Sequence, residues 1–281
     1  MTKPLRVVAA TDLSDRGEIA IRRAHGLNAV HGGALTVVHV IDEVFQESMA
    51  IGMRREAGNL IAGQIAVLPQ TPGGVEVAIE IARGRPAASI AELCERTGAE
   101  LLVAGAYRSD PLRDLLHGST VHRALTLAET PALIAREGGS AAPSRVVAAV
   151  DFSIASERAL SFARRLYPHA KIALVHALDL VKSAFIPGNA AERYRAQAQK
   201  TAEAELAAFA RRLELGGALE SMLVHAGEPA DIILRQSALL GAEVVAMGTH
   251  GRTGIGHALL GSVALSVMDR ANSDLLVVRA W

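Results

Sequence analysis

The chain repeats itself at a distance of about half its length. The repeat is visible in three pairs of segments that follow one another in the same order: LRVVAATDLSDRGEIAIRRA (5–24) with SRVVAAVDFSIASERALSFA (144–163), LTVVHVID (35–42) with IALVHALD (172–179), and RGRPAASIAELCERTGAELLVAG (83–105) with AGEPADIILRQSALLGAEVVAMG (226–248). A repeat this long indicates two homologous domains rather than a solenoid of short units.

The boundary between the two repeats falls in a short segment of small and polar residues. EGGSAAP, residues 137–143, ends in a proline and has the composition of a linker. We therefore expect domains at residues 1–137 and 144–281, joined by a linker at 138–143. A chain of 281 residues is long enough to give each domain its own core.

Each half alternates short apolar runs with longer segments of helical pattern. In the second half, the apolar runs are residues 145–150, 171–178, 221–224, 243–247 and 274–278. Continuous apolar runs are typical of strands that are covered on both faces of a parallel sheet. Strands that alternate with helices predict an α/β fold, and an aromatic content of 3% means a core of Ala, Val, Leu and Ile.

The composition of the chain argues against some classes of binding partner. Lys plus Arg equals Asp plus Glu at 29 each, so net charge does not favour a nucleic acid. No stretch has the length of a membrane span and the N-terminus has no apolar leader, so we expect no membrane association and a cytoplasmic protein. The single cysteine, Cys94, rules out an intrachain disulfide and is interpreted as a small buried apolar residue of a helix.

A glycine-rich segment, GTHGRTGIGHALLGS at 248–262, follows the fourth apolar run of the second half. Gly248 can let a ligand lie against bare backbone, and Gly251 can take a positive φ. Gly261 and Ser262 precede a helical pattern, where free N–H groups favour an anion, and the Ser262 hydroxyl can cap the helix or donate to a phosphate. The segment predicts a phosphate cradle; the alternative is a strand-to-helix turn with unusual dihedral angles.

These motifs together resemble the universal stress protein family. The resemblance rests on the glycine spacing, on Asp-x-Ser after the first strand of each half (Asp12, Asp151), on VHV and VHA in the second strands, and on Gly-x-Pro after the third (Gly84, Gly227). It covers nearly the whole chain twice. It implies two tandem Rossmann-like domains of the adenine nucleotide alpha-hydrolase-like type, each a five-stranded parallel sheet flanked by helices.

The resemblance also implies a ligand and the residues that hold it. Family members with an intact glycine pattern bind ATP at the carboxyl ends of the sheet, with Mg²⁺ held mainly by phosphate and water. Carried onto this chain, the residues are Gly251, Gly261, Ser262 and Val263 for the phosphates, Met247 and Gly248 beside the ribose, and Asp151 and the backbone of Ala177 near the adenosine. Asp151 is also interpreted as a cap of the following helix.

The first half departs from this pattern. Its loop reads GAYRSDPLRDLLHGST (105–120), with Arg108 where the second glycine would stand, and with Asp110 and Pro111 after it. A side chain at that position crowds a phosphate that rests on the backbone, and proline removes an N–H. We interpret this loop as degenerate; the alternative is that the Arg108 side chain itself reaches a phosphate.

Histidines raise the question of a metal. His225, His250 and His257 belong to segments near the predicted mouth of the second site, but no metal-ligand spacing connects them, so a metal site stays open. His39 and His176 lie inside apolar runs and are interpreted as hydrogen-bonded core residues.

We therefore expect a stress-response protein that binds ATP in its second half and acts as a nucleotide-dependent sensor or regulator. A protein partner would recognise its nucleotide-bound form. Two alternatives stay open: an interaction scaffold without nucleotide, and a slow ATPase with a separate small-molecule pocket in the first half. No catalytic signature marks a dedicated enzyme. The resemblance further implies an intramolecular pseudo-dimer of the two halves, with a homodimer as an additional assembly.

Overall fold

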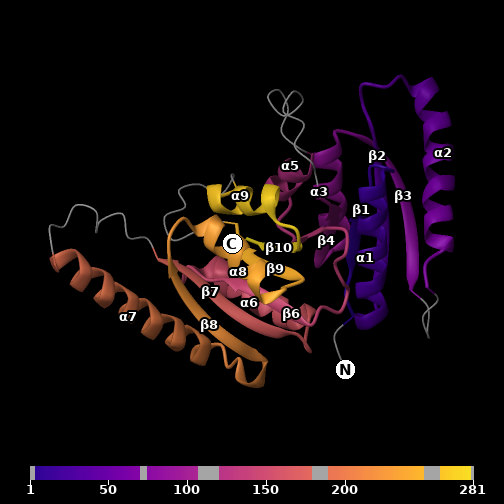
Figure 1. The fold of residues 1–281 in the computed structure, drawn as a ribbon. Coiled ribbons are helices and arrows are strands. Elements are labelled where there is room, and N and C mark those ends of the chain that lie inside the picture. The colour runs from indigo at the N-terminus through magenta and orange to yellow at the C-terminus, as the bar shows by residue number, and fades with distance from the viewer. Residues whose placement is uncertain (1–3, 70–74, 107–119, 179–188, 250–259, 280–281) are drawn as a thin grey trace. The chain divides into compact units, whose positions relative to one another are not determined.

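The structure is a computed structural model and describes residues 4–69, 75–106, 120–178, 189–249 and 260–279 (Figure 1). The chain divides into two compact units, residues 1–142 and residues 143–255 together with 261–280, which we call the first and second domains. Each is an α/β unit built on parallel strands, which confirms the fold class expected from the sequence.

In the first domain, the described strands follow the order β3-β2-β1-β4-β5. The elements are β1 (Val7–Ala10), α1 (Asp15–His31), β2 (Ala34–Asp42), α2 (Glu47–Ala66), β3 (Glu76–Gly84), α3 (Pro86–Thr97), β4 (Leu101–Gly105), α5 (Thr120–Leu127) and β5 (Ala132–Ala135). Helices α1 and α2 contact one another and form one layer on the strands, and α3 and α5 contact one another and form the other layer.

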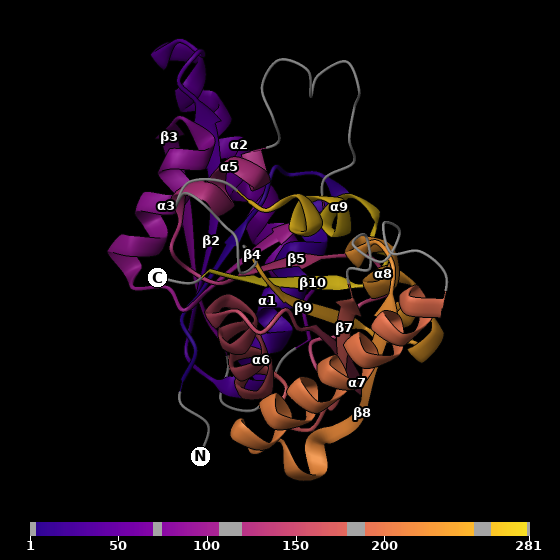
Figure 2. The ribbon, with the colours of Figure 1, turned by 90° about the vertical axis from the view of Figure 1, so that its left-hand side faces the viewer.

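The second domain repeats this arrangement in the order β10-β9-β6-β7-β8. Its elements are β6 (Arg145–Ala149), α6 (Ile154–Leu166), β7 (Lys171–Leu178), α7 (Asn189–Arg212), the 3-10 turn η2 (Gly216–Ala218), β8 (Leu219–Ala226), α8 (Pro229–Leu240), β9 (Val244–Gly248), α9 (Ser262–Arg270) and β10 (Asp274–Val278). Figure 2 shows α6 and α7 on one side of β9 and β10, with α9 on the other.

The same local signals start and stop the matching helices of the two domains. The Ser14 hydroxyl accepts from the N–H of Gly17 at the start of α1, and the Ser153 hydroxyl accepts from the N–H of Ser156 at the start of α6. The third helix of each domain begins at a proline and ends before a left-handed glycine, Gly98 with φ of 59° in the first domain and Gly241 with φ of 61° in the second.

Burial is deepest in the central strands. Almost every residue of β1, β4, β6 and β9 is buried, as expected for strands covered on both faces. The edge strand β8 differs from the sequence expectation, because most of its residues are partly or fully exposed. An edge strand has a sheet neighbour on one side only, and its apolar run is correspondingly broken by Glu220 and Ser221.

Within the described part of the chain, no helix combines the length and the apolar character that crossing a membrane requires. Cys94 lies on α3 and is 1% exposed, which confirms that it packs as a small apolar side chain. Burial raises the pKa of its thiol to about 11, although a hydrogen bond with Thr130 acts in the opposite direction.

We predict that Cys94 is almost inert in the folded protein. At pH 8 a thiol with a pKa of about 11 is a thiolate in roughly one molecule in a thousand, and only the thiolate attacks thiol reagents. Labelling with a disulfide reagent should therefore be at least about a hundredfold slower in buffer than in denaturing urea. Comparable rates in the two solutions would show that α3 does not bury this side chain.

Candidate functional site

A cavity of about 360 Å³ lies at the carboxyl ends of the strands of the second domain. In an open α/β sheet, this edge is where ligands bind. All of the ligand residues expected in the described part of the chain line it: Asp151, Ala177, Met247, Gly248, Gly261, Ser262 and Val263. The remaining one, Gly251, lies outside the described residues.

Asp151 lines the cavity and also holds the turn between β6 and α6. Its Oδ1 accepts hydrogen bonds from the backbone N–H of Ser153 at 3.0 Å and from the Ser153 hydroxyl at 2.6 Å. Phe152, between them, has a φ of 62°, which a tight turn of this kind requires. Asp151 thus supports the N-cap of α6 through Ser153 rather than by capping the helix itself.

His176, on β7, has a structural role. Its Nδ1 donates to the carbonyl oxygen of Val150 at 2.7 Å, and its ring lies against the ring of Phe152 with centroids 4.6 Å apart. In the first domain, His39 Nδ1 donates to the carbonyl of Thr11 at 3.0 Å. Both histidines are therefore hydrogen-bonded to the backbone that precedes the first helix, as expected from their place in apolar runs.

The structure gives Gly248 a role that the sequence did not reveal. A Cβ at this position would lie 2.6 Å from the Cβ of Ala155 and 2.9 Å from its carbonyl carbon. The end of β9 therefore approaches the first turn of α6 so closely that only a glycine fits. Packing of the strand against the helix is a reason for this glycine that is independent of any ligand.

The start of α9 forms the other wall of the cavity. Gly261 is the N-cap, with φ −64° and ψ 151°, and its N–H donates to the carbonyl of Thr249 at 2.8 Å. A glycine has no side chain with which to cap the helix, and the interpretation of Ser262 as an N-cap is wrong: Ser262 is the first helical residue and is exposed. The first helical bond runs from Leu265 N–H to Gly261 C=O. The N–H groups of the first turn before Leu265 are thus available to an anion.

The described residues offer no group of three or more His, Cys, Asp or Glu that could hold a metal ion. His225 lies on β8, paired with Ala177 of β7, whereas His250 and His257 lie outside the described residues.

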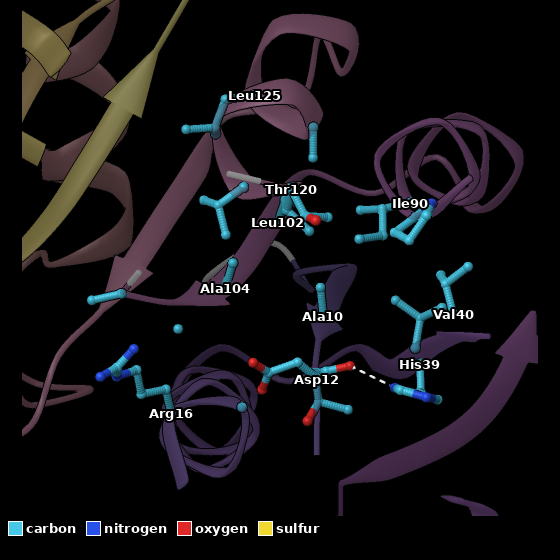
Figure 3. Close-up of a pocket in the computed structure, with 18 residues that line it drawn as sticks. Ala10, Asp12, Arg16, His39, Val40, Ile90, Leu102, Ala104, Thr120 and Leu125 are labelled. Atoms are coloured by element: carbon cyan, nitrogen blue, oxygen red, sulfur yellow. Dashed lines mark hydrogen bonds between the residues drawn. The ribbon is translucent and has the colours of Figure 1, made fainter. Parts of the chain in front are cut away.

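The first domain has a cavity of about 250 Å³ at the matching position (Figure 3). Its lining corresponds closely to that of the second, with Asp12 in place of Asp151 and Gly105 in place of Gly248. Arg108, Asp110 and Pro111, on which the interpretation of a degenerate loop rests, lie outside the described residues.

Sequence reasoning missed a cationic side chain that lines this first cavity. Arg16, in the first turn of α1, lines it at the position that Ala155 holds in the second domain. The signal was present in the repeat: aligning LSDRGEIA with FSIASERA places Arg16 opposite Ala155. A cation is thus added to one of two otherwise similar cavities.

Comparison with known proteins supports two homologous domains in this chain. The model of the universal stress protein family matches residues 5–136 and again residues 143–279. The universal stress protein Rv2005c of Mycobacterium tuberculosis is 24% identical, over 99% of each chain. The crystal structure of a universal stress protein from Archaeoglobus fulgidus covers 99% of this chain and 97% of its own with a TM-score of 0.76 at 19% identity. A protein of Pseudomonas aeruginosa, PA1789, covers 97% of this chain and 92% of its own with a TM-score of 0.67 at 20% identity.

We predict that Gly248→Ala destabilises the protein even without ligand. The added Cβ would overlap Ala155, and such overpacking costs about 1–3 kcal/mol. Gly217→Ala in η2 is the matched control, because its Cβ would meet nothing within 4 Å. Urea denaturation followed by circular dichroism should show an earlier unfolding transition for the first variant only. Equal midpoints would show that β9 does not approach α6 closely enough to exclude a Cβ at this position.

Proposed function

Because this chain belongs to the universal stress protein family, we propose that its second domain binds ATP and that the protein acts in the cytoplasm as a nucleotide-dependent sensor or regulator of a stress response. The observation that carries the proposal is the second-domain cavity, in which the ends of β6, β7 and β9 face the uncapped start of α9. Such a cavity offers a place for a base and a place for phosphates.

The strand side of the cavity suits the adenosine. Val175, Pro229 and Ile233 contribute apolar surface to the lining, against which an adenine ring would lie. Asp151 and the backbone of Ala177 would make polar contacts with the adenosine, and Met247 and Gly248 would border the ribose. The hydrogen bonds that hold Asp151 to Ser153 would fix its carboxylate before a ligand arrives.

The helix side of the cavity suits the phosphates. The N–H groups at the start of α9 and the positive end of the helix dipole would face them, and the Ser262 hydroxyl is free to donate because it does not cap the helix. No Lys or Arg occurs among the described lining residues of this cavity. Backbone N–H donors and a Mg²⁺ ion bound to the nucleotide would therefore balance the negative charge of the phosphates.

Nucleotide occupancy would then affect one surface of the second domain. Thr249 and Gly261 both line the cavity and are joined by the Gly261 N–H to Thr249 C=O hydrogen bond. A ligand in the cavity would contact both residues, and a protein partner would bind the surface that they help to form.

We predict that isothermal titration of Mg-ATP into the nucleotide-stripped full chain gives one site per chain, and that Gly261→Leu abolishes it. The backbone of Gly261, at φ −64° and ψ 151°, is accessible to any residue, so the variant should fold. Its side chain would fill the space that the phosphates need. Gly217→Leu, on an exposed turn away from the cavity, should bind as the natural protein does.

Other outcomes separate the alternatives. No heat of binding in the natural protein would contradict the proposal and favour an interaction scaffold. Two sites per chain would mean that the first domain also takes ATP. ADP that forms in proportion to the protein, and that Gly261→Leu suppresses, would favour a slow ATPase.

A further inference from the structure

The cavity of the first domain has a charged side and an apolar side. Figure 3 shows Asp12 and Arg16 on one side, next to His39, and Ile90 and Leu125 on the other. The rest of the lining consists largely of Ala, Val, Leu, Ile and Pro side chains. A ligand that fills this space must therefore be amphipathic.

The two charges of the cavity are of opposite sign and do not pair with each other. Asp12 Oδ1 accepts from the backbone N–H and from the hydroxyl of Ser14, and no ion pair joins Asp12 to Arg16. In the described part of the chain, the Arg16 guanidinium has neither an ion pair nor a hydrogen bond. One cation and one carboxylate thus face the same cavity, each with capacity for a further partner.

Close packing holds Arg16 at this place. A Cβ on Gly105, at the end of β4, would collide with the backbone carbonyl of Arg16 and lie 3.0 Å from its Cβ. The base of the Arg16 side chain is therefore fixed against the carboxyl end of β4, at the edge of the cavity. The matching contact in the second domain, Gly248 with Ala155, brings no charge to that edge.

The first-domain cavity is also smaller than the second-domain cavity. Its volume is about 250 Å³, against about 360 Å³ in the second domain. Sites for drug-sized ligands measure about 300–1,000 Å³, so the first cavity suits a smaller molecule. Among the described lining residues, one Arg and one Asp bring opposite charges, which favours a ligand that carries both a cationic and an anionic group.

We propose that the first domain binds a zwitterionic α-amino acid with an apolar side chain. Arg16 would pair with the ligand carboxylate, for which its planar guanidinium provides parallel donors. Asp12 would accept from the ammonium group, and the apolar side chain would lie against Ile90 and Leu125. This site is separate from the proposed nucleotide site and does not depend on it.

The test is calorimetric titration of the full chain with three related molecules. L-leucine carries both charges, 4-methylpentanoate lacks the ammonium group, and 3-methylbutylamine lacks the carboxylate. We expect one leucine per chain, with each analogue bound at least about tenfold more weakly, since a charge-assisted hydrogen bond is lost in each case.

Substitutions on α1 test whether Arg16 contacts the carboxylate of the ligand. Arg16→Ala should weaken leucine binding at least about tenfold and leave binding of 3-methylbutylamine unchanged, because that amine has no carboxylate to pair with Arg16. Arg22→Ala is the matched control: Arg22 lies on the same helix, is exposed, and pairs with Glu18 outside this cavity. It should bind all three molecules as the natural protein does.

Several results would overturn the proposal. No heat of binding from leucine at millimolar concentration would exclude the site. Binding of 4-methylpentanoate as tight as that of leucine would remove the role of Asp12 and indicate a simple anion site. Leucine binding that Arg16→Ala leaves unchanged would place the amino acid elsewhere. Mg-ATP binding that falls with Arg16→Ala would assign this cavity to a nucleotide instead.

Discussion

In both domains, the cavity depends on one close approach between the end of a strand and the start of a helix. Gly105 meets Arg16 in the first domain and Gly248 meets Ala155 in the second, and a Cβ on either glycine would collide with the helix. This contact brings the carboxyl end of the fourth strand against the helix that follows the first strand. The cavity opens beside that contact, so its position follows from packing and not from a ligand.

Residues that line the two cavities, or lie beside the lining, also maintain the fold. Asp151 and Ser153 hold the turn before α6, and Asp12 and Ser14 do the same before α1. His39 and His176 hold the backbone carbonyl just before each turn. These hydrogen bonds fix the orientation of the polar groups, and such restriction would lower the entropic cost of binding a ligand.

The two cavities diverge in the kind of group that meets an anion. In the second domain the uncapped first turn of α9 offers backbone N–H groups, and no cationic side chain occurs among the described lining residues. In the first domain Arg16 brings a guanidinium. Backbone donors suit a phosphate chain that lies along them, whereas a single guanidinium suits one carboxylate. The two cavities thus share their backbone arrangement but differ in the polar groups that line them.

Much of the fold could be read from the sequence, because local patterns determine it. The repeat, the apolar runs, and the serines and prolines that begin the helices are short-range signals, and the glycine-rich segment marked one wall of the second cavity. Other features were decided by tertiary contacts alone. Gly248 is required by its distance to Ala155, a residue far away in the sequence. Gly261 rather than Ser262 occupies the N-cap position of α9, and Arg16 lines a cavity whose other walls come from β1, β2, α3, β4 and α5. Sequence spacing specifies neighbours along the chain, and only packing determines which distant residues share a cavity.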